Sequence, residues 1–405
     1  MSQSAFSWND KRSTLRLSPT FVIVMTIFID LTGFGMVIPL LPFYADSLQA
    51  GSTALGVLVA SFAVMQFIFS PVLGRISDRA GRRPILLLSI LTSMASFVLF
   101  ALAESYIVLL LSRIIAGMAT ETAVAQAYIA DITTKKGRAS GIGKVGAAHG
   151  AGFIVGPALG GILSVYGFWA PGVAAALLTS VNLVFVFLFL PESINRRDPI
   201  HQQRRSKESI IHRPLGTLGK SEISAVLTIF FIITLAFSAI PVVAPLLGRD
   251  LFGIGPVEMS YFFIYIGLVQ VLLQGFVIGR LAKMFGEEKL TAVGVLLIMV
   301  GMFFTPLISH IANFLVSLTA VVFGIGMLNT VIPSFISKRT TAAKQGGALG
   351  TAQSVSSIAR VPGPLMGGFV YEFAGLAAPF FLSAALLAFA FGLSCRVFQI
   401  CARTA

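Results

Sequence analysis

Residues 74–83 have the sequence Gly-Arg-Ile-Ser-Asp-Arg-Ala-Gly-Arg-Arg, and apolar runs at 52–73 and 84–103 flank them. Each run is close to the ~20 residues that cross a bilayer as a helix. Glycine permits a tight turn, so Gly74 and Gly81 fit a short loop between two such helices. The stretch therefore predicts a helix–loop–helix unit of a membrane protein.

The rest of the chain has the same character. Of its 405 residues, 56% are hydrophobic and 11% are charged, whereas a soluble domain carries about 25% charged residues. So much apolar sequence must face lipid as well as a protein core. We expect an all-α integral membrane protein with twelve transmembrane helices, at 20–43, 52–73, 84–103, 105–128, 140–164, 168–190, 222–246, 258–279, 289–308, 312–335, 346–371 and 377–399.

Basic residues are distributed unevenly between the loops. All 29 Lys and Arg residues except Arg113, Arg249 and Arg360 lie before the first segment, around the loops that follow even-numbered segments, or after the last segment. Positive charge gathers on the cytoplasmic side of membrane proteins. The pattern predicts a multi-pass protein of the inner (plasma) membrane with both termini in the cytoplasm. It also explains the net charge of +13 without nucleic acid binding.

Two internal repeats divide the chain into halves. The segment Gly74–Gly81 recurs as Gly279–Gly286, and Gly156–Gly161 (Gly-Pro-Ala-Leu-Gly-Gly) recurs 207 residues later as Gly363–Gly368 (Gly-Pro-Leu-Met-Gly-Gly). Parallel six-helix repeats are one plan of secondary transporters. The expected parts are a cytoplasmic tail (1–19), a six-helix bundle (20–190), a cytoplasmic linker (191–221), a second six-helix bundle (222–399) and a short cytoplasmic tail (400–405).

The segment 74–83 resembles, in order and spacing, the loop signature of the major facilitator superfamily. Three further stretches resemble the tetracycline/proton antiporters and related 12-span drug/proton antiporters: Asp30-Leu-Thr-Gly33, Arg113-Ile-Ile-Ala-Gly117 and Ala127-Tyr-Ile-Ala-Asp131. The resemblance covers about residues 21–195 and is mainly architectural beyond them. It implies the major facilitator fold, with two pseudo-symmetric bundles.

In that family the loop braces one conformation by reaching the start of span 11, here near Gly346–Gly350. The alternative is a loop whose charge only sets orientation, although Asp78 among arginines would not serve that purpose. Span 5 resembles the antiporter signature of efflux branches, and tight helix packing alone also explains its glycines. The expected gating residues are Gly74, Asp78, Arg79, Gly81, Arg82, Arg83, Gly156, Pro157, Gly160 and Gly161.

The second copy of the loop has a different charge pattern. Lys283 stands where the first copy has Asp78, and Glu287 and Glu288 replace the arginine pair. This difference argues against an equivalent second brace.

Ionisable groups inside apolar segments are costly and indicate function. Asp30 lies ten residues, about 15 Å, into span 1, and Glu121 lies in span 4 two turns from Arg113. Buried carboxylates can be tuned to exchange protons near neutral pH. We expect Asp30 and Glu121 to carry protons, with Arg113 as their counter-charge. The resemblance implies that Asp30 is needed for transport and that Arg113 takes part in proton transfer. Glu121 departs from the tetracycline pattern, which has small residues there. The alternative for Asp30 and Arg113 is a structural pair that neutralises itself.

Further polar groups lie in the spans. Glu121 could bind a cationic compound instead of a proton, and Arg360 could bind an anionic group or pair with a carboxylate. His149 could equally be a packed histidine. The expected substrate-binding residues are Glu121, His149, Gln270, Gln274, Asn329 and Arg360.

The sequence thus predicts a proton-coupled antiporter that exports small amphipathic or drug-like compounds, as a monomer. No cofactor or metal is expected, and the proton is the coupling ion. The alternative is a carrier for a sugar, a siderophore or an anionic metabolite. An enzyme is not expected, because the sequence holds no P-loop, zinc or nucleophile-elbow motif and its polar segments are short.

Overall fold

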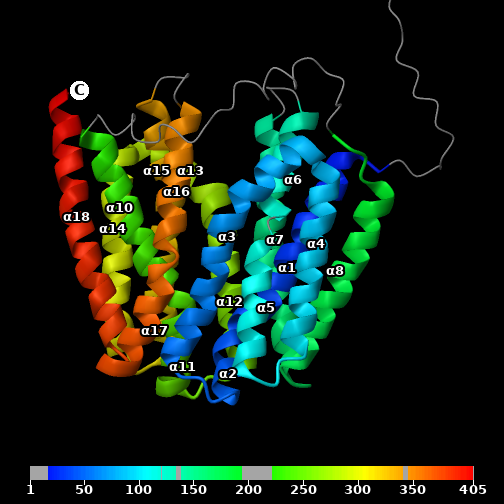
Figure 1. Cartoon of the computed structure of the whole chain (residues 1–405). Coiled ribbons are helices and arrows are strands. Elements are labelled where there is room, and N and C mark those ends of the chain that lie inside the picture. The colour runs from blue at the N-terminus through cyan, green and yellow to red at the C-terminus, as the bar shows by residue number, and fades with distance from the viewer. Residues whose placement is uncertain (1–16, 120, 134–137, 194–220, 341–344, 405) are drawn as a thin grey trace, which may run out of the picture.

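The computed structural model describes residues 17–119, 121–133, 138–193, 221–340 and 345–404, and these residues form helices without a strand (Figure 1). The first half contains α1 (Pro19–Val37), η1 (Ile38–Leu40), α2 (Leu41–Ser47), α3 (Ser52–Ala80), α4 (Arg82–Ala101), α5 (Tyr106–Met118), α6 (Glu121–Ile132), α7 (Arg138–Ser164) and α8 (Trp169–Phe189). The second half contains α10 (Ser221–Ser238), α11 (Ile240–Phe252), α12 (Pro256–Leu272), η3 (Leu273–Val277), α13 (Ile278–Phe285), α14 (Glu287–Phe304), η4 (Thr305–Leu307), α15 (Ile311–Lys338), α16 (Gln345–Ala359), α17 (Pro362–Ala374) and α18 (Ala378–Thr404).

Ten helical stretches of the described chain are long and apolar enough to cross a membrane. The other two expected spans, 258–279 and 346–371, are interrupted. In the first, α12 passes through the π-helical turn η3 into α13. In the second, α16 and α17 are separated at Arg360 and Val361, directly before Pro362. Proline lacks an N–H donor, so Pro362 cannot make the next helical hydrogen bond, which explains this break although Val361 keeps helical dihedral angles.

Three other boundaries differ from expectation. The span expected at 52–73 continues as α3 to Ala80, so most of the predicted loop at 74–83 is helical and only Gly81 separates α3 from α4. The span expected at 105–128 is split into α5 and α6, because Ala119 has an extended conformation. The last helix continues to Thr404 instead of ending at 399, since no glycine or proline interrupts Gln399–Thr404 and Ala402 and Arg403 favour helix.

The helix α8 illustrates why these segments need a bilayer. One face carries the exposed apolar side chains Leu177, Val181, Val184 and Leu188 at helical spacing. The opposite face is buried against the protein. A helix that is apolar on all sides cannot present either face to water.

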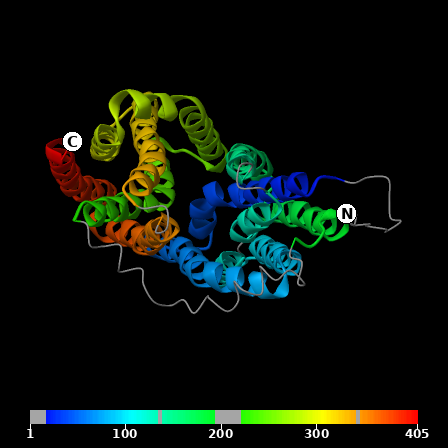
Figure 2. The same ribbon diagram turned by 90° about the horizontal axis from the view of Figure 1, so that it is seen from above.

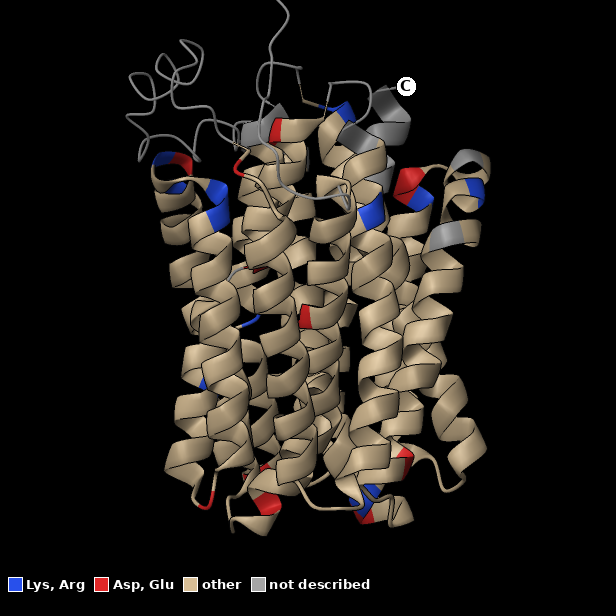
Figure 3. Cartoon of the chain, turned by 90° about the vertical axis from the view of Figure 1, so that its right-hand side faces the viewer, with Lys and Arg blue, Asp and Glu red and all other residues tan. Residues whose placement is uncertain are grey.

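The two halves lie side by side, with α1–α8 on one side and α10–α18 on the other (Figure 2). Charged residues gather at the two ends of the helices and are sparse between them (Figure 3). The end that carries the loop between α3 and α4 is called the basic end here, and the opposite end the far end.

The glycines of α7 allow close contact with two different helices. A Cβ on Gly156 would lie 2.5 Å from the carbonyl oxygen of Thr32, and one on Gly160 would also overlap the α1 backbone. Gly161 instead faces the second half, where its Cβ would lie 2.5 Å from the Cβ of Ser260 in α12. Small residues thus let α7 pack on α1 within its half and on α12 across the halves.

The second copy of this motif packs in the same way. Gly363 and Gly367 of α17 face α10 and α11 within their own half, and Gly368 faces the Ser52 backbone of α3 across the halves. The sequence repeat is therefore a repeat of packing.

Candidate functional site

A cavity of about 630 Å³ lies between the two halves. It is lined by α1, α3, α4, α5, α6 and α7 of the first half and by α16 and Arg360 of the second. It brings together five of the residues singled out from the sequence: Asp30, Arg113, Glu121, His149 and Arg360. Its apolar walls include Phe34, Phe62, Phe67, Phe97 and Phe153.

Three expected substrate-binding residues are not part of this lining. Gln270 is half-buried in α12, whereas Gln274 in η3 and Asn329 in α15 are exposed. Their position in apolar spans was the reason to select them, but position along a helix does not give the direction of the side chain.

Two carboxylates face the cavity. Glu121 is the first residue of α6, is buried, and accepts a hydrogen bond of 2.6 Å from Ser93 Oγ. Asp30 projects from the middle of α1 and is half-buried. Both groups line the same cavity, whose walls are largely apolar. Like charges in a site of low polarity disfavour simultaneous ionisation, so a proton on one of the two carboxyls would be favoured.

Arg113 lines the same cavity as Asp30 and Glu121 but forms no direct ion pair with either. Its side chain is only 2% exposed, yet no ion pair within 4.0 Å joins it to Asp30 or Glu121, all three being described residues. Its Nη2 has no hydrogen-bond partner, and the guanidinium carbon lies 5.4 Å from the centre of the Phe100 ring. A buried cation without a carboxylate partner is costly, which favours a functional over a structural role.

Helix interruptions coincide with the cavity. The break between α5 and α6 occurs beside Ala119, and the break between α16 and α17 occurs at Arg360; both residues line the cavity. Irregular backbone at membrane depth is tolerated where it is buried in protein or lines a polar cavity. Discontinuous helices of this kind form the binding sites of many transporters.

Sequence reasoning missed several lining residues. They are polar groups in α3, α6 and α16: Gln66, Ser70, Gln126, Gln353, Ser354 and Ser357. Spacing offered a signal, because Gln353, Ser357 and Arg360 recur at helical intervals in an otherwise apolar run.

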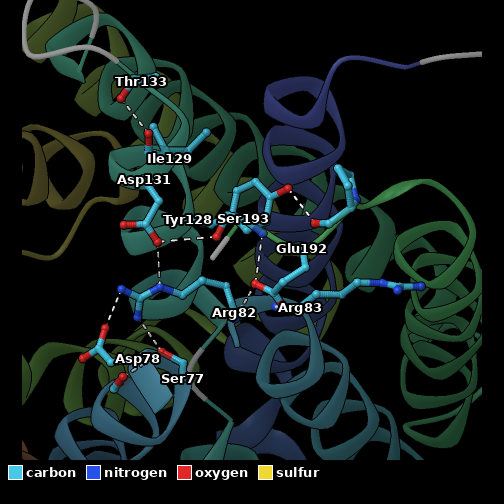
Figure 4. Close-up of polar contacts among 12 residues, drawn as sticks. Ser77, Asp78, Arg82, Arg83, Tyr128, Ile129, Asp131, Thr133, Glu192 and Ser193 are labelled. Atoms are coloured by element: carbon cyan, nitrogen blue, oxygen red, sulfur yellow. Dashed lines mark hydrogen bonds and ion pairs between the residues drawn. The ribbon is translucent and has the colours of Figure 1, made fainter. Parts of the chain in front are cut away.

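The loop Gly74–Arg83 forms a polar network at the basic end (Figure 4). Arg82 pairs with Asp78 at 2.5 Å and with Asp131 of α6 at 2.9 Å, and it donates to Ser77 Oγ at 2.6 Å. Gly81 joins α3 to α4 with φ +110°, a conformation that glycine adopts without strain. The network ties α3, α4 and α6 into one unit.

Glu192, just after α8, completes this network. Its carboxylate accepts hydrogen bonds from the backbone N–H groups of Arg82 and Arg83, at 2.9 and 3.2 Å. These N–H groups open α4, where the helix dipole favours an anion. Arg83 in turn donates to the carbonyl oxygen of Phe187 at 2.6 Å.

The gating contact expected with α16 is not formed at two positions. A Cβ on Gly74 or on Gly350 would meet no atom within 4 Å. The exposed Asp78 carboxylate pairs with Arg82 of the same loop. Neither glycine therefore makes the close helix contact that gating by this segment would require.

The second copy of the loop forms an ion pair that the sequence comparison did not anticipate. Glu287, which aligns with Arg82, pairs with Lys338 at the end of α15 at 2.8 Å and accepts a hydrogen bond from Ser334. Asp131, the partner of Arg82, ends α6 in the same way. The two halves therefore carry equivalent ion pairs with exchanged charges.

Polar contacts join the halves at the far end. Arg249 of α11 pairs with Asp46 of α2 at 2.9 Å, and the Thr53 backbone N–H donates to the Glu372 carboxylate at 2.7 Å. Arg249 also pairs with Asp250 at 2.7 Å, whose other oxygen accepts from the Tyr371 hydroxyl at 2.8 Å. The far end is thus closed by ionic contacts as well as by helix packing.

Known proteins are similar to this chain over most of its length. The family model of the Major Facilitator Superfamily matches residues 23–363. The chain is 33% identical to a class E tetracycline resistance protein of Escherichia coli over 86% of this chain and 87% of that one. It is 30% identical to a class H tetracycline resistance protein of Pasteurella multocida over 87% and 88%.

A solved structure has the same fold. A bacterial homologue of the human lysosomal transporter Spinster, in an inward-facing and occupied conformation, superposes with a TM-score of 0.78 at 14% identity, over 94% of this chain and 96% of that one. The all-helical fold, the apolar spans and the sequence matches agree, and the chain belongs to the Major Facilitator Superfamily, as a multi-pass membrane transporter of small molecules and not an enzyme.

Proposed function

We propose that this transporter exports small amphipathic, drug-like compounds in exchange for protons, by alternating access of the cavity to the two sides of the membrane. The observation that carries the proposal is the pair of carboxylates, Asp30 and Glu121, in a cavity with aromatic walls. A carboxylate pair offers a proton site, and phenylalanine rings offer apolar contact to varied ligands. The named tetracycline resistance relatives, and a multidrug resistance protein of Bacillus subtilis at 27% identity, support export.

Orientation and conformation follow from the charges. The basic end is assigned to the cytoplasm by the distribution of Lys and Arg, which puts both termini there in the inner (plasma) membrane. The far end is closed by the contacts of Arg249 and Glu372, whereas at the basic end a Cβ on Gly74 or on Gly350 would have no neighbour within 4 Å. We infer an inward-facing conformation of a protein that acts as a monomer.

The test is transport in proteoliposomes under an imposed pH gradient. Asp30→Asn keeps the size of the side chain but removes its ability to bind and release a proton. We expect this variant to lose proton-driven transport while it still inserts and folds. Full activity of Asp30→Asn would refute the assignment of Asp30 to proton coupling.

Arg360 favours one alternative, a carrier of anionic metabolites. Competition in the same proteoliposomes separates the two functions. Lipophilic cations and tetracyclines should compete for the exporter, and small polar anions for the alternative carrier.

A further inference from the structure

Among the described residues, Arg360 is the one charged residue that the second half contributes to the cavity lining. The other lining residues from that half are Gln353, Ser354 and Ser357. The repeat offset of 207 aligns Arg360 with Phe153 of α7, which also lines the cavity. Equivalent positions of the two halves thus present an aromatic ring on one side and a guanidinium on the other.

The Arg360 side chain has no acidic partner among the described residues. It is open to the cavity and forms neither an ion pair nor a hydrogen bond there. Arg82 and Arg249, at the two ends of the helices, each pair with two carboxylates. A guanidinium at membrane depth is costly without a counter-charge, so an anion that enters the cavity would gain a strong partner.

The surroundings of Arg360 are suited to an acidic group on an apolar molecule. The His149 ring lines the same cavity and stacks on Phe153 with centroids 5.3 Å apart. Ser357 and Gln353 lie about one and two turns earlier on α16 and also line the cavity. Amide and hydroxyl groups can donate to the oxygens of a carboxylate.

We propose that Arg360 is an anion-binding residue and that the cavity selects amphipathic compounds that carry an acidic group, as organic acids or zwitterions. The proposal rests on the proposed function only in taking this cavity as the substrate site. The acidic group binds Arg360, and the apolar body lies on the Phe153 side of the cavity. In a zwitterion, the cationic group faces Asp30 and Glu121.

The test uses binding to the purified transporter in detergent, where no gradient acts. Rhodamine 110 and its methyl ester, rhodamine 123, differ only in a free carboxyl group, and fluorescein carries the carboxyl group without the amines. Fluorescence anisotropy measures the affinity for each dye. We expect the wild type to bind rhodamine 110 more tightly than its ester. If fluorescein binds as tightly as rhodamine 110, the site is one for organic acids. If fluorescein binds more weakly than rhodamine 110, the site is one for zwitterions.

Variants separate binding from structure. Arg360→Gln should weaken rhodamine 110 binding by about tenfold or more, the usual effect of losing a charged hydrogen bond, and leave rhodamine 123 within about twofold. Arg360→Lys should recover much of the loss. Arg280→Gln, at an exposed site outside the cavity, is the matched control and should change neither dye.

Several results would overturn the proposal. They are equal losses for both rhodamines in Arg360→Gln, wild-type preference for the ester, or wild-type binding of neither carboxyl-bearing dye. Failure of the proposed function is a separate outcome, because a transporter that binds the free acid selectively but moves no compound under a pH gradient would refute proton-coupled export alone.

Discussion

The ion pair between Asp46 and Arg249 should hold the far end closed, and removing it should favour the conformation that is open at that end. The 2.9 Å contact links α2 of the first half to α11 of the second. Arg249 keeps Asp250 as a partner when Asp46 is changed, so Asp46→Asn leaves no arginine without a carboxylate. The substitution therefore weakens the link between the halves and little else.

The expected size of the effect follows from exposure. The Asp46 side chain is 61% exposed and that of Arg249 is 32% exposed. Ion pairs in such surroundings contribute about 0.2–1 kcal/mol, because water and salt screen them. A free energy of that size changes the ratio of two conformations by roughly 1.4- to 5-fold. A larger change would require that the pair also organises the helix contacts around it.

Accessibility of the far-end interface measures the change. Ser260 of α12 is buried against Gly161 of α7, and Ser260→Cys is nearly isosteric. With Cys395 and Cys401 replaced by serine, the rate at which a membrane-impermeant maleimide modifies Ser260→Cys reports how often this interface opens. We expect Asp46→Asn to raise the rate of modification by roughly 1.4- to 5-fold, the change in the ratio of the two conformations.

The matched control is Glu104→Gln, which removes an exposed carboxylate from the far-end loop between α4 and α5. It should leave the rate unchanged. An unchanged or slower rate in Asp46→Asn, or an equal rise in Glu104→Gln, would refute the role of the ion pair. Added salt should reduce the difference between the wild type and Asp46→Asn, since it screens the same attraction.

Two further predictions concern packing and charge within the halves. Gly156→Ala should destabilise the protein by about 1–3 kcal/mol, because its Cβ would overlap the Thr32 carbonyl oxygen. Thermal unfolding in detergent measures this loss. The control is Gly143→Ala in the same helix, where nothing lies within 4 Å of the new Cβ, and it should not lower the unfolding temperature. Glu287→Lys should lower thermal stability and transport, because it places a like charge beside Lys338. Adding Lys338→Glu should restore most of the stability and the transport, because the pair then has the same order of charges as the pair in the first half. A double variant that is no better than Glu287→Lys would contradict the equivalence of the two ion pairs.

Much of the fold could be predicted from the sequence, because the bilayer imposes one strong condition on length and hydropathy. Apolar runs gave the positions of most spans, and Gly81 and the arginines after it marked the turn between α3 and α4. The repeat Gly363–Gly368 also indicated packing, since a position that tolerates no Cβ in one half has a counterpart in the other.

The cavity was predictable only in part, because an apolar helix gives no signal for which face looks inward. Asp30, Glu121 and Arg360 could be chosen because charge at membrane depth is costly wherever it points. Gln274 and Asn329 could not be excluded in the same way, since neutral amides on an exposed face carry a smaller penalty. The pairing of Arg113 depends on rotation of α5 against α1 and α6, which spacing along one helix does not determine.

The break before Glu121 has a consequence that connects the local sequence with the proposed coupling. In a continuous helix, Glu121 would be one residue among many on the wall of span 4. As the first residue of α6, it stands at a helix N-terminus, where unpaired N–H groups favour a carboxylate. Ser93 Oγ also donates to this carboxylate, at 2.6 Å. In the proposed exchange, a change in the contacts of α5 and α6 during alternating access would alter both of these interactions of Glu121, so we expect the interruption to link proton movement to conformation.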